Sequence, residues 1–221
     1  MLYIVSTPIG NLKDITLRAL EVLKSVDLIA AEDTRQTKKL SQHYGINTPL
    51  TSYFEYNKFR KGDFLLGLLK QGQKIALVSD SGTPGISDPG YHLINLAIKN
   101  NIPVTSIPGP TAVIAALSLS GMPTDKFVFE GFLSAKRVAR KKRLAELAGE
   151  KRTVIIYESP HRLIKCLKDI AEILNDPLIV CARELTKKFE EVKRERASQL
   201  IEHFTKNRPR GEFVLIFNPN L

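Results

Sequence analysis

The segment with the richest chemistry is a loop of glycine, proline and acidic residues, S-D-S-G-T-P-G-I-S-D-P-G, at residues 79–90. Its glycines permit positive φ angles and a close approach of the backbone to a ligand, and its prolines stiffen it. Free N–H groups and the carboxylates of Asp80 and Asp88 suit a polar ligand with an ammonium group, hydroxyls and a carboxylate. The alternative is a long structural turn in which Asp88 caps the next helix, but ordered loops of this length are usually functional.

Two other segments could supply acid–base chemistry. Glu32-Asp33-Thr34-Arg35 follows an apolar run, and one of its carboxylates could act as a base or orient a substrate hydroxyl. Equally, Asp33 or Thr34 could only cap a helix, and Arg35 could only pair with Asp33. Glu158 lies in the similar segment Y-E-S-P-H-R at residues 157–162, where His161 could be either a functional or a surface residue.

The sequence disfavours several common sites. It has no G-x-x-x-x-G-K-[ST] and no G-x-G-x-x-G, which argues against a nucleoside triphosphate loop and an ordinary Rossmann dinucleotide site. The 4 histidines are scattered, and 2 cysteines cannot form a Cys-rich zinc site or a disulfide framework. We therefore expect no metal.

Strands and helices that alternate along the chain must position these segments. In the first half, apolar runs predict strands at 2–6, 27–31, 50–53, 75–78 and 104–107, and helical spacing predicts helices at 16–25, 34–44, 57–70, 90–100 and 111–120. In the second half the strands are 127–132, 153–157, 178–182, 213–217 and an edge strand within 188–196, with helices at 140–148, 161–175 and 197–207. The fold class is therefore α/β, and the first half should form a mostly parallel sheet.

A break at G-M-P-T, residues 121–124, separates the two halves, so we predict domains at 1–120 and 121–221. In the first domain the helix-to-strand connections are short. The strand-to-helix connections are longer and carry the polar residues, at 7–11, 32–35, 54–57, 79–90 and 108–111. Ligands of open α/β sheets bind outside the carboxyl ends of the strands. The sequence therefore predicts a small-molecule cleft at that edge.

The net charge of +10 indicates a polyanionic partner. Residues 1–118 hold 12 basic and 9 acidic side chains, whereas residues 119–221 hold 21 and 14. The densest stretch is K-R-V-A-R-K-K-R at 136–143, which contains no acid and is typical of a polyanion contact. A second basic cluster, at 187–196, is diluted by glutamates and is better interpreted as a solvated face.

No apolar run approaches the ~20 residues that span a bilayer, and the first residues show no signal peptide. We therefore expect a cytoplasmic protein without a membrane partner.

Six motifs, taken together and in order, carry a family resemblance. They are S-T-P-I-G-N-L-x-D-I-T-L-R-A, A-A-E-D-T-R, S-D-S-G-T-P-G-I-S-D-P-G, P-G-P-T-A, Y-E-S-P-H-R and A-R-E-L-T-K. Over residues 1–217 the chain resembles the ribosomal RNA small subunit methyltransferase I family, within the tetrapyrrole (corrin/porphyrin) methylase superfamily.

The resemblance implies two α/β domains of the tetrapyrrole methylase type, the second with a mixed sheet, and S-adenosylmethionine bound in the cleft between them. It implies 2′-O-methylation of a cytidine in the decoding region of 16S ribosomal RNA, on free RNA or on the assembled small subunit, by a homodimer. The cofactor-binding residues would be Pro8, Asp80, Ser81, Gly82, Thr83, Pro84, Ile86, Pro108, Thr111, Ala112, Tyr157, Ala182, Gly211 and Phe213.

The catalytic and RNA-binding candidates come from the residues themselves. A ribose hydroxyl is a weak nucleophile that a nearby carboxylate would help, so the catalytic candidates are Asp33, Glu32, Glu158 and Arg35. Phosphate contacts are expected from Lys136, Arg137, Arg140, Lys141, Lys142 and Arg143. Tyr53 and Tyr56, together with Phe54, are candidates for stacking on an unpaired nucleotide.

The chain departs from the family pattern in two places. Many relatives have S-Y-H-E-H-N where residues 52–57 read S-Y-F-E-Y-N, so a histidine base is not available in that loop. Many relatives also have a further helical segment, whereas this chain stops at Leu221. If that segment contributes to RNA binding, we expect binding here to rest on the basic stretches or on a separate partner. Two alternatives stay open, namely a tetrapyrrole or other small-molecule methylase and a non-catalytic RNA-binding relative.

Overall fold

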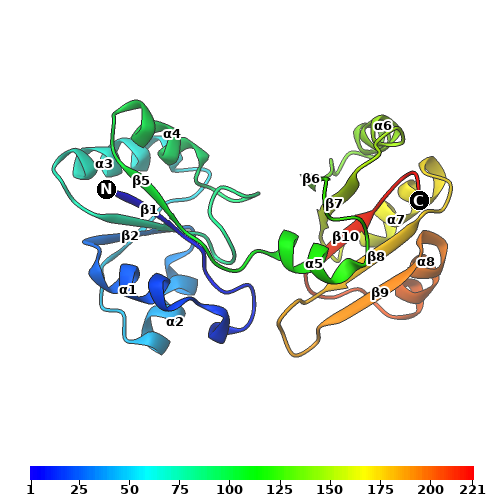
Figure 1. Cartoon of the computed structure of the whole chain (residues 1–221), viewed down its shortest axis with the longest axis horizontal. Coiled ribbons are helices and arrows are strands. Elements are labelled where there is room, and N and C mark those ends of the chain that lie inside the picture. Colours follow the sequence, from blue (N-terminus) through cyan, green and yellow to red (C-terminus); the bar gives the residue numbers. More distant parts are fainter. The chain divides into compact units, whose positions relative to one another are not determined.

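The computed structural model describes residues 1–221 and divides the chain into two compact units, Met1–Thr111 and Ala112–Leu221 (Figure 1). The predicted boundary near residue 120 lies one helix later than this division. The helix concerned, α5 (Ala112–Ser120), packs against strand β10 (Phe213–Phe217) and so belongs to the second unit. No helix in either unit is long and apolar enough to cross a bilayer.

The first unit is a five-stranded sheet in which every pairing is parallel, in the order β3-β2-β4-β1-β5. Its strands are β1 (Leu2–Val5), β2 (Leu28–Ala31), β3 (Leu50–Ser52), β4 (Ile75–Val78) and β5 (Val104–Ile107). Its helices are α1 (Leu17–Ser25), α2 (Thr34–Tyr44), α3 (Lys58–Lys70) and α4 (Tyr91–Lys99), with a short 3-10 turn at Leu12–Asp14. The sequence prediction of a mostly parallel α/β sheet is confirmed.

The strand order decides which helices cover which face. The chain moves in one direction from β1 to β2 to β3 and then back through β4 to β5. Because parallel crossovers are right-handed, the first two helices and the last two must lie on opposite faces, as Figure 1 shows for α1 and α2 against α3 and α4. The buried residues split accordingly, with Val5, Leu23 and Leu40 in one core and Leu2, Leu65 and Leu93 in the other.

The second unit is a mixed sheet in the order β6-β7-β10-β8-β9, in which only β6 and β7 pair in parallel. Its remaining strands are β6 (Phe127–Phe132), β7 (Thr153–Glu158), β8 (Leu178–Arg183) and β9 (Glu191–Arg196). Helices α6 (Arg137–Leu147), α7 (Leu163–Ile173) and α8 (Ala197–Lys206) share one core with the sheet. This confirms the mixed sheet.

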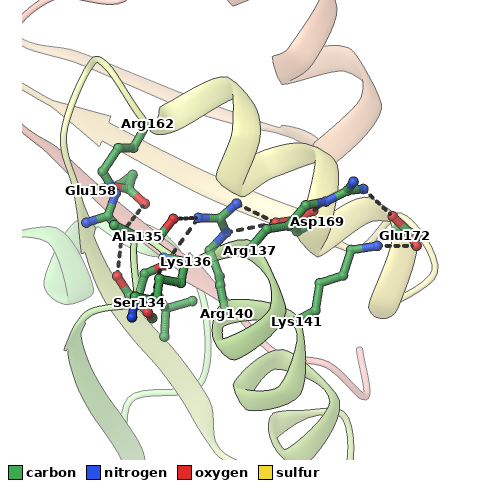
Figure 2. A network of polar contacts seen from close by, with 11 residues as sticks. Ser134, Ala135, Lys136, Arg137, Arg140, Lys141, Glu158, Arg162, Asp169 and Glu172 are labelled. Carbon is green, nitrogen blue, oxygen red and sulfur yellow. Dashed lines mark hydrogen bonds and ion pairs between the residues drawn. The ribbon is translucent and has the colours of Figure 1, made fainter.

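A buried ion pair joins α6 to α7 (Figure 2). The Arg140 side chain is 4% exposed and that of Asp169 is 2% exposed. Arg140 Nε and Nη2 donate to Asp169 Oδ2 at 2.8 and 2.6 Å, and its Nη1 donates to the carbonyl oxygens of Ser134 and Ala135. Arg137 also donates to Asp169, at 3.2 Å, and α6 begins at this residue, earlier than the predicted residue 140.

We predict that Asp169→Ala lowers the free energy of unfolding by about 3–5 kcal/mol, because it leaves the Arg140 guanidinium buried without its counter-ion. The matched control is Glu172→Ala. Glu172 also accepts ion pairs from α6 but is 54% exposed, so its loss should cost less than about 1 kcal/mol. Urea unfolding of both variants measures the difference, and equally small losses would contradict a stabilising role for the buried pair.

Candidate functional site

Two carboxylates meet at the carboxyl edge of the parallel sheet. Ala31 of β2 pairs with Val78 of β4, so the segments that begin at Glu32 and Ser79 leave the sheet side by side. The Asp80 N–H donates to Glu32 Oε2 at 3.2 Å, and the Asp33 N–H donates to Asp80 Oδ1 at 3.0 Å. A backbone N–H of each segment therefore binds a carboxylate of the other segment. We call the two carboxylates, Glu32 and Asp80, the acid pair.

Both carboxylates of the acid pair have pKa values above the ordinary ones. Burial raises the pKa of Glu32 above its ordinary value, and the negative charges of Asp80 and Asp33 raise it further. Burial also raises the pKa of Asp80, again with help from the Asp33 charge. Carboxylates with raised pKa values are better proton acceptors than ordinary ones at neutral pH, so Glu32 is the candidate base that the geometry supports.

Asp33 has a different environment. Its carboxylate caps α2 by accepting the Arg35 N–H at 2.8 Å, and the Arg35 guanidinium donates to it at 3.0 and 2.6 Å. These hydrogen bonds lower the pKa of Asp33 to about 2. Asp33 is therefore a poor proton acceptor, and the structure favours the capping and pairing alternative for Asp33 and Arg35 over a catalytic one.

Backbone contacts join the glycine-rich loop to its neighbours. Thr7 and Gly82 exchange N–H···O=C bonds of 2.8 and 2.9 Å, and the hydroxyls of Ser6 and Thr83 lie 2.8 Å apart. Gly82 has a φ of +76°, and a Cβ at Gly109 would lie 2.9 Å from Ser6 Cβ. The loops that follow β1, β4 and β5 are thus packed backbone against backbone, which only glycine permits at these two positions.

The first-unit cofactor candidates lie in or beside these joined loops. Pro84 is buried and Ile86 is 44% exposed. The N-cap residue of helix α4 is Gly90 rather than Asp88. The remaining first-unit candidates in these loops are Pro8, Asp80, Ser81, Gly82, Thr83, Pro108 and Thr111.

The second-unit cofactor candidates meet across three strands. Tyr157 of β7 and Ala182 of β8 both pair with Val214 of β10. The Tyr157 ring packs edge-on against Phe129 and Phe132, with centroids 4.9 and 5.6 Å away. Phe213 is buried, and its ring centroid lies 5.5 Å from that of Phe204. A ligand would therefore meet only the backbone of Phe213.

Two other second-unit candidates flank these strands. Ala112 begins α5, and Gly211 precedes β10 with a φ of +87°. The Glu184 side chain fills the space beside Gly211 and accepts the Glu212 N–H at 3.1 Å. Gly211 thus has a structural reason to be glycine that is independent of any ligand.

Glu158 does not fit the role of a base. Its side chain is fully buried, accepts the Ser159 N–H at 2.8 Å and lies 3.1 Å from Arg162 Nε. Arg162 in turn donates to the Leu133 carbonyl oxygen. Because a substrate hydroxyl cannot reach a carboxylate enclosed in this way, the prediction of Glu158 as a catalytic base is wrong.

The structure corrects much of the predicted basic surface (Figure 2). Arg140 is buried and paired with Asp169, so its assignment to RNA binding is wrong. Lys141 pairs with Glu172, and Arg143 pairs with Glu130 and Glu146. Except for Glu146, which follows in the same helix, these acids come from other elements of the fold, which is why the run seems unneutralised in sequence. Lys136 and Lys142 are exposed and make no ion pair.

The predicted aromatic surface also changes. Tyr53 is 1% exposed, and its hydroxyl oxygen accepts the Leu93 N–H at 3.0 Å, so it cannot stack on a nucleotide. Burial raises the pKa of Tyr53 to about 12. Tyr56 is 95% exposed and Phe59, which sequence reasoning missed, is 65% exposed. The feature of the sequence that could have indicated an exposed Phe59 is its place in the first turn of α3, where a buried residue is not required.

No group of three or more His, Cys, Asp or Glu side chains is arranged to hold a metal ion.

Comparison with known proteins places this geometry in a family. The family model of the tetrapyrrole (corrin/porphyrin) methylases matches residues 1–201. The chain is 54% identical to a ribosomal RNA small subunit methyltransferase I of Synechocystis, covering 98% of this chain and 78% of that protein. It is 46% identical to the Thermotoga maritima protein of the same name, covering 98% and 97%.

The chain belongs to the ribosomal RNA small subunit methyltransferase I family. The resemblance drawn from the six motifs is thus confirmed, as is the tetrapyrrole methylase fold.

Solved structures agree on the fold. A cobalt precorrin-4 methyltransferase of cobalamin biosynthesis superposes with a TM-score of 0.75 at 18% identity, covering 98% of this chain and 94% of that one. A uroporphyrin-III C-methyltransferase from Thermus thermophilus, solved with S-adenosyl homocysteine, gives 0.67 at 18% identity, covering 97% and 96%.

We predict that Gly109→Ala destabilises the protein by about 1–3 kcal/mol, because its Cβ would overlap the Ser6 Cβ in a tightly packed backbone crossing. The matched control is Gly67→Ala in α3. No heavy atom lies within 4 Å of a Cβ built there, so this change should stabilise the helix by about 0.5–1 kcal/mol. Thermal unfolding of both variants measures the two signs, and a neutral Gly109→Ala would contradict the close approach.

Proposed function

We propose that this protein is an S-adenosylmethionine-dependent methyltransferase that modifies the 2′-hydroxyl of a cytidine in the decoding region of 16S ribosomal RNA. The observation that carries the proposal is the family membership over 98% of the chain. The acid pair at the carboxyl edge adds independent support, since a methyl transfer to a hydroxyl profits from a carboxylate that accepts the proton.

The loops of the first unit fit the cofactor. The Thr7–Gly82 bridge and the close approach of Gly109 to Ser6 hold together the loops that carry the cofactor candidates. The Asp80 carboxylate lies beside them, at an exposed position, and can accept hydrogen bonds from an ammonium or hydroxyl group. Asp80, Gly82, Thr83 and Thr111 would thus hold the amino acid and ribose parts. When bound, the cofactor supplies an electrophilic methyl carbon on a sulfonium.

The residues of this chain would then prepare the nucleophile. A ribose hydroxyl close to Glu32 can pass its proton to a carboxylate whose raised pKa favours proton uptake. The Asp33–Arg35 pair fixes the start of α2 and hence the backbone on which Glu32 lies. Most of the remaining acceleration comes from holding the hydroxyl in line with the methyl carbon.

The setting of the enzyme follows from this substrate. A ribosomal RNA methyltransferase works where small subunits are made, so we infer a cytoplasmic enzyme that acts on the RNA or on the assembled subunit. We also infer that it works as a homodimer, as the family resemblance implies.

Methyl transfer to purified small subunits and to their free RNA tests the proposal. We expect incorporation into a single cytidine, with mass mapping of nuclease fragments placing the methyl group on the ribose. Cofactor binding, measured by calorimetry, serves as the control. Binding without transfer to any RNA would instead support the small-molecule methylase or the non-catalytic alternative.

We predict that Glu32→Gln lowers the methyl-transfer rate by about 10²–10⁴-fold, the usual contribution of a general base. Because only the ionised carboxylate accepts a proton, the wild-type rate should fall as the pH drops through the pKa of Glu32. Burial raises that pKa, so the fall should begin at a higher pH than for an ordinary glutamate.

The matched control is Glu21→Gln on the exposed face of α1, which should change neither the rate nor its pH profile. Glu32→Gln should not lower the free energy of unfolding, because it removes a charge that burial disfavours. A full rate with an unchanged pH profile in Glu32→Gln would exclude Glu32 as the base.

A further inference from the structure

A groove with both polar and apolar lining residues lies between α2 and the edge strand β3 in the first unit. It has a volume of about 640 Å³, and its lining includes Thr34, Arg35, Lys38, Gln42, Asn47 and Thr48. It follows α2 from its first residue toward its last turn. At a rise of 1.5 Å per residue, the lining residues from Thr34 to Gln42 span about 12 Å. The groove is therefore long enough for a chain-like ligand rather than for a single ion.

The lining has one sign of charge. Two cations, Arg35 and Lys38, line the groove and no carboxylate does. Asp33 neutralises Arg35, whereas Lys38 is exposed and makes no ion pair. Most other lining side chains are hydroxyls and amides, which hydrogen-bond to phosphate and ribose oxygens. The cations disfavour a cationic ligand, and the hydroxyls and amides can bond to an anionic strand, while Ile46 and Leu50 add an apolar part to the lining on which a base or ribose can rest.

One end of the groove lies at the first turn of α2, which follows Glu32 and Asp33 directly in the chain. Thr34 and Arg35, at one of its ends, follow directly on Glu32 and Asp33, and the Arg35 guanidinium bonds to Asp33. A strand lying along α2 would therefore bring the next nucleotide to the carboxyl edge of the sheet. Phosphate contacts of this kind set register and orientation without reading the bases.

We propose that this groove holds the RNA strand next to the target nucleotide, with Lys38 as its phosphate-contacting cation. The inference rests on the proposed function and adds a second RNA-binding surface to the one predicted at 136–143. Most cations of the 136–143 run are already paired. The proposal therefore assigns part of the RNA affinity to the first unit, which carries the acid pair.

A second copy of this chain is the competing occupant, because β3 is an edge strand whose outer side is unpaired. Two features argue against it. Strand β3 has only 3 residues, which offers few backbone hydrogen bonds. A symmetric contact would also bring the same cations of both copies together, and like charges placed face to face oppose association.

Lys38 and Lys39 provide a matched test, since both are exposed lysines on α2 and each replacement by alanine removes one charge. Lys39 does not line the groove, and its Nζ donates to Gln36 Oε1 at 3.0 Å. The probe is an unmodified transcript of small-subunit ribosomal RNA, titrated at several salt concentrations. The other readouts are cofactor affinity and the oligomeric state by light scattering.

We expect Lys38→Ala to weaken RNA binding and to reduce the slope of log K against log salt by about 0.7–0.9, the value of one phosphate contact. The KM for RNA should rise while kcat and cofactor affinity stay unchanged. Lys39→Ala should leave the slope and KM as in the wild type.

The outcomes separate the two proposals. Equal slopes for both variants, or a change of oligomeric state in Lys38→Ala without a loss of RNA affinity, would overturn the groove assignment. If the wild type binds and methylates RNA but Lys38→Ala behaves like it, only the groove assignment fails. If the wild type neither binds nor methylates RNA, the proposed function itself fails.

Discussion

The parallel alignment of all five strands in the first unit is the constraint on which the candidate site depends. Parallel strands end at one edge, so residues that follow different strands meet there although the sequence separates them widely. The register of β2 with β4 brings Glu32 to Asp80. The bridge between Thr7 and Gly82, and the contact of Gly109 with Ser6, close the loops after β1, β4 and β5 on one another. No single motif creates the site, because each supplies one side of it.

Much of this arrangement could be predicted from the sequence. Alternating apolar runs located every strand and helix, and the contrast between short and polar connections identified the carboxyl edge. The positive φ of Gly82 could be anticipated because its reason is local, whereas the close approach of Gly109 to Ser6 depends on a loop distant in sequence. The environments of the individual carboxylates could not be predicted in the same way. Asp33 and Glu32 are neighbours, yet Arg35 lowers the pKa of one while burial raises that of the other.

The environments of the charged surface residues were even harder to predict from the sequence. The run at 136–143 contains no acid, so its sequence suggests six free cations. Asp169, Glu172 and Glu130 lie on other elements, and only the packing of α6 against α7 and β6 brings them to the run. Arg140 stabilises the core of the second unit, because its guanidinium is enclosed and each of its nitrogens donates a hydrogen bond. Tyr53 is a parallel case, since its hydroxyl accepts a backbone N–H that belongs to α4.

Helix α2 connects these observations. Its first turn is fixed by the Asp33 cap and by Arg35, and its buried residues, including Leu40, anchor it on the sheet. Lys38 lies beside this anchored face, in the groove between α2 and β3, and has no acid partner. A cation that stabilises nothing in the folded protein retains its full charge for a ligand, whereas the paired cations of α6 would have to exchange one partner for another. Phosphate contacts should therefore fall on unpaired cations, which include Lys38 in the groove along α2 as well as Lys136 and Lys142 of the 136–143 run.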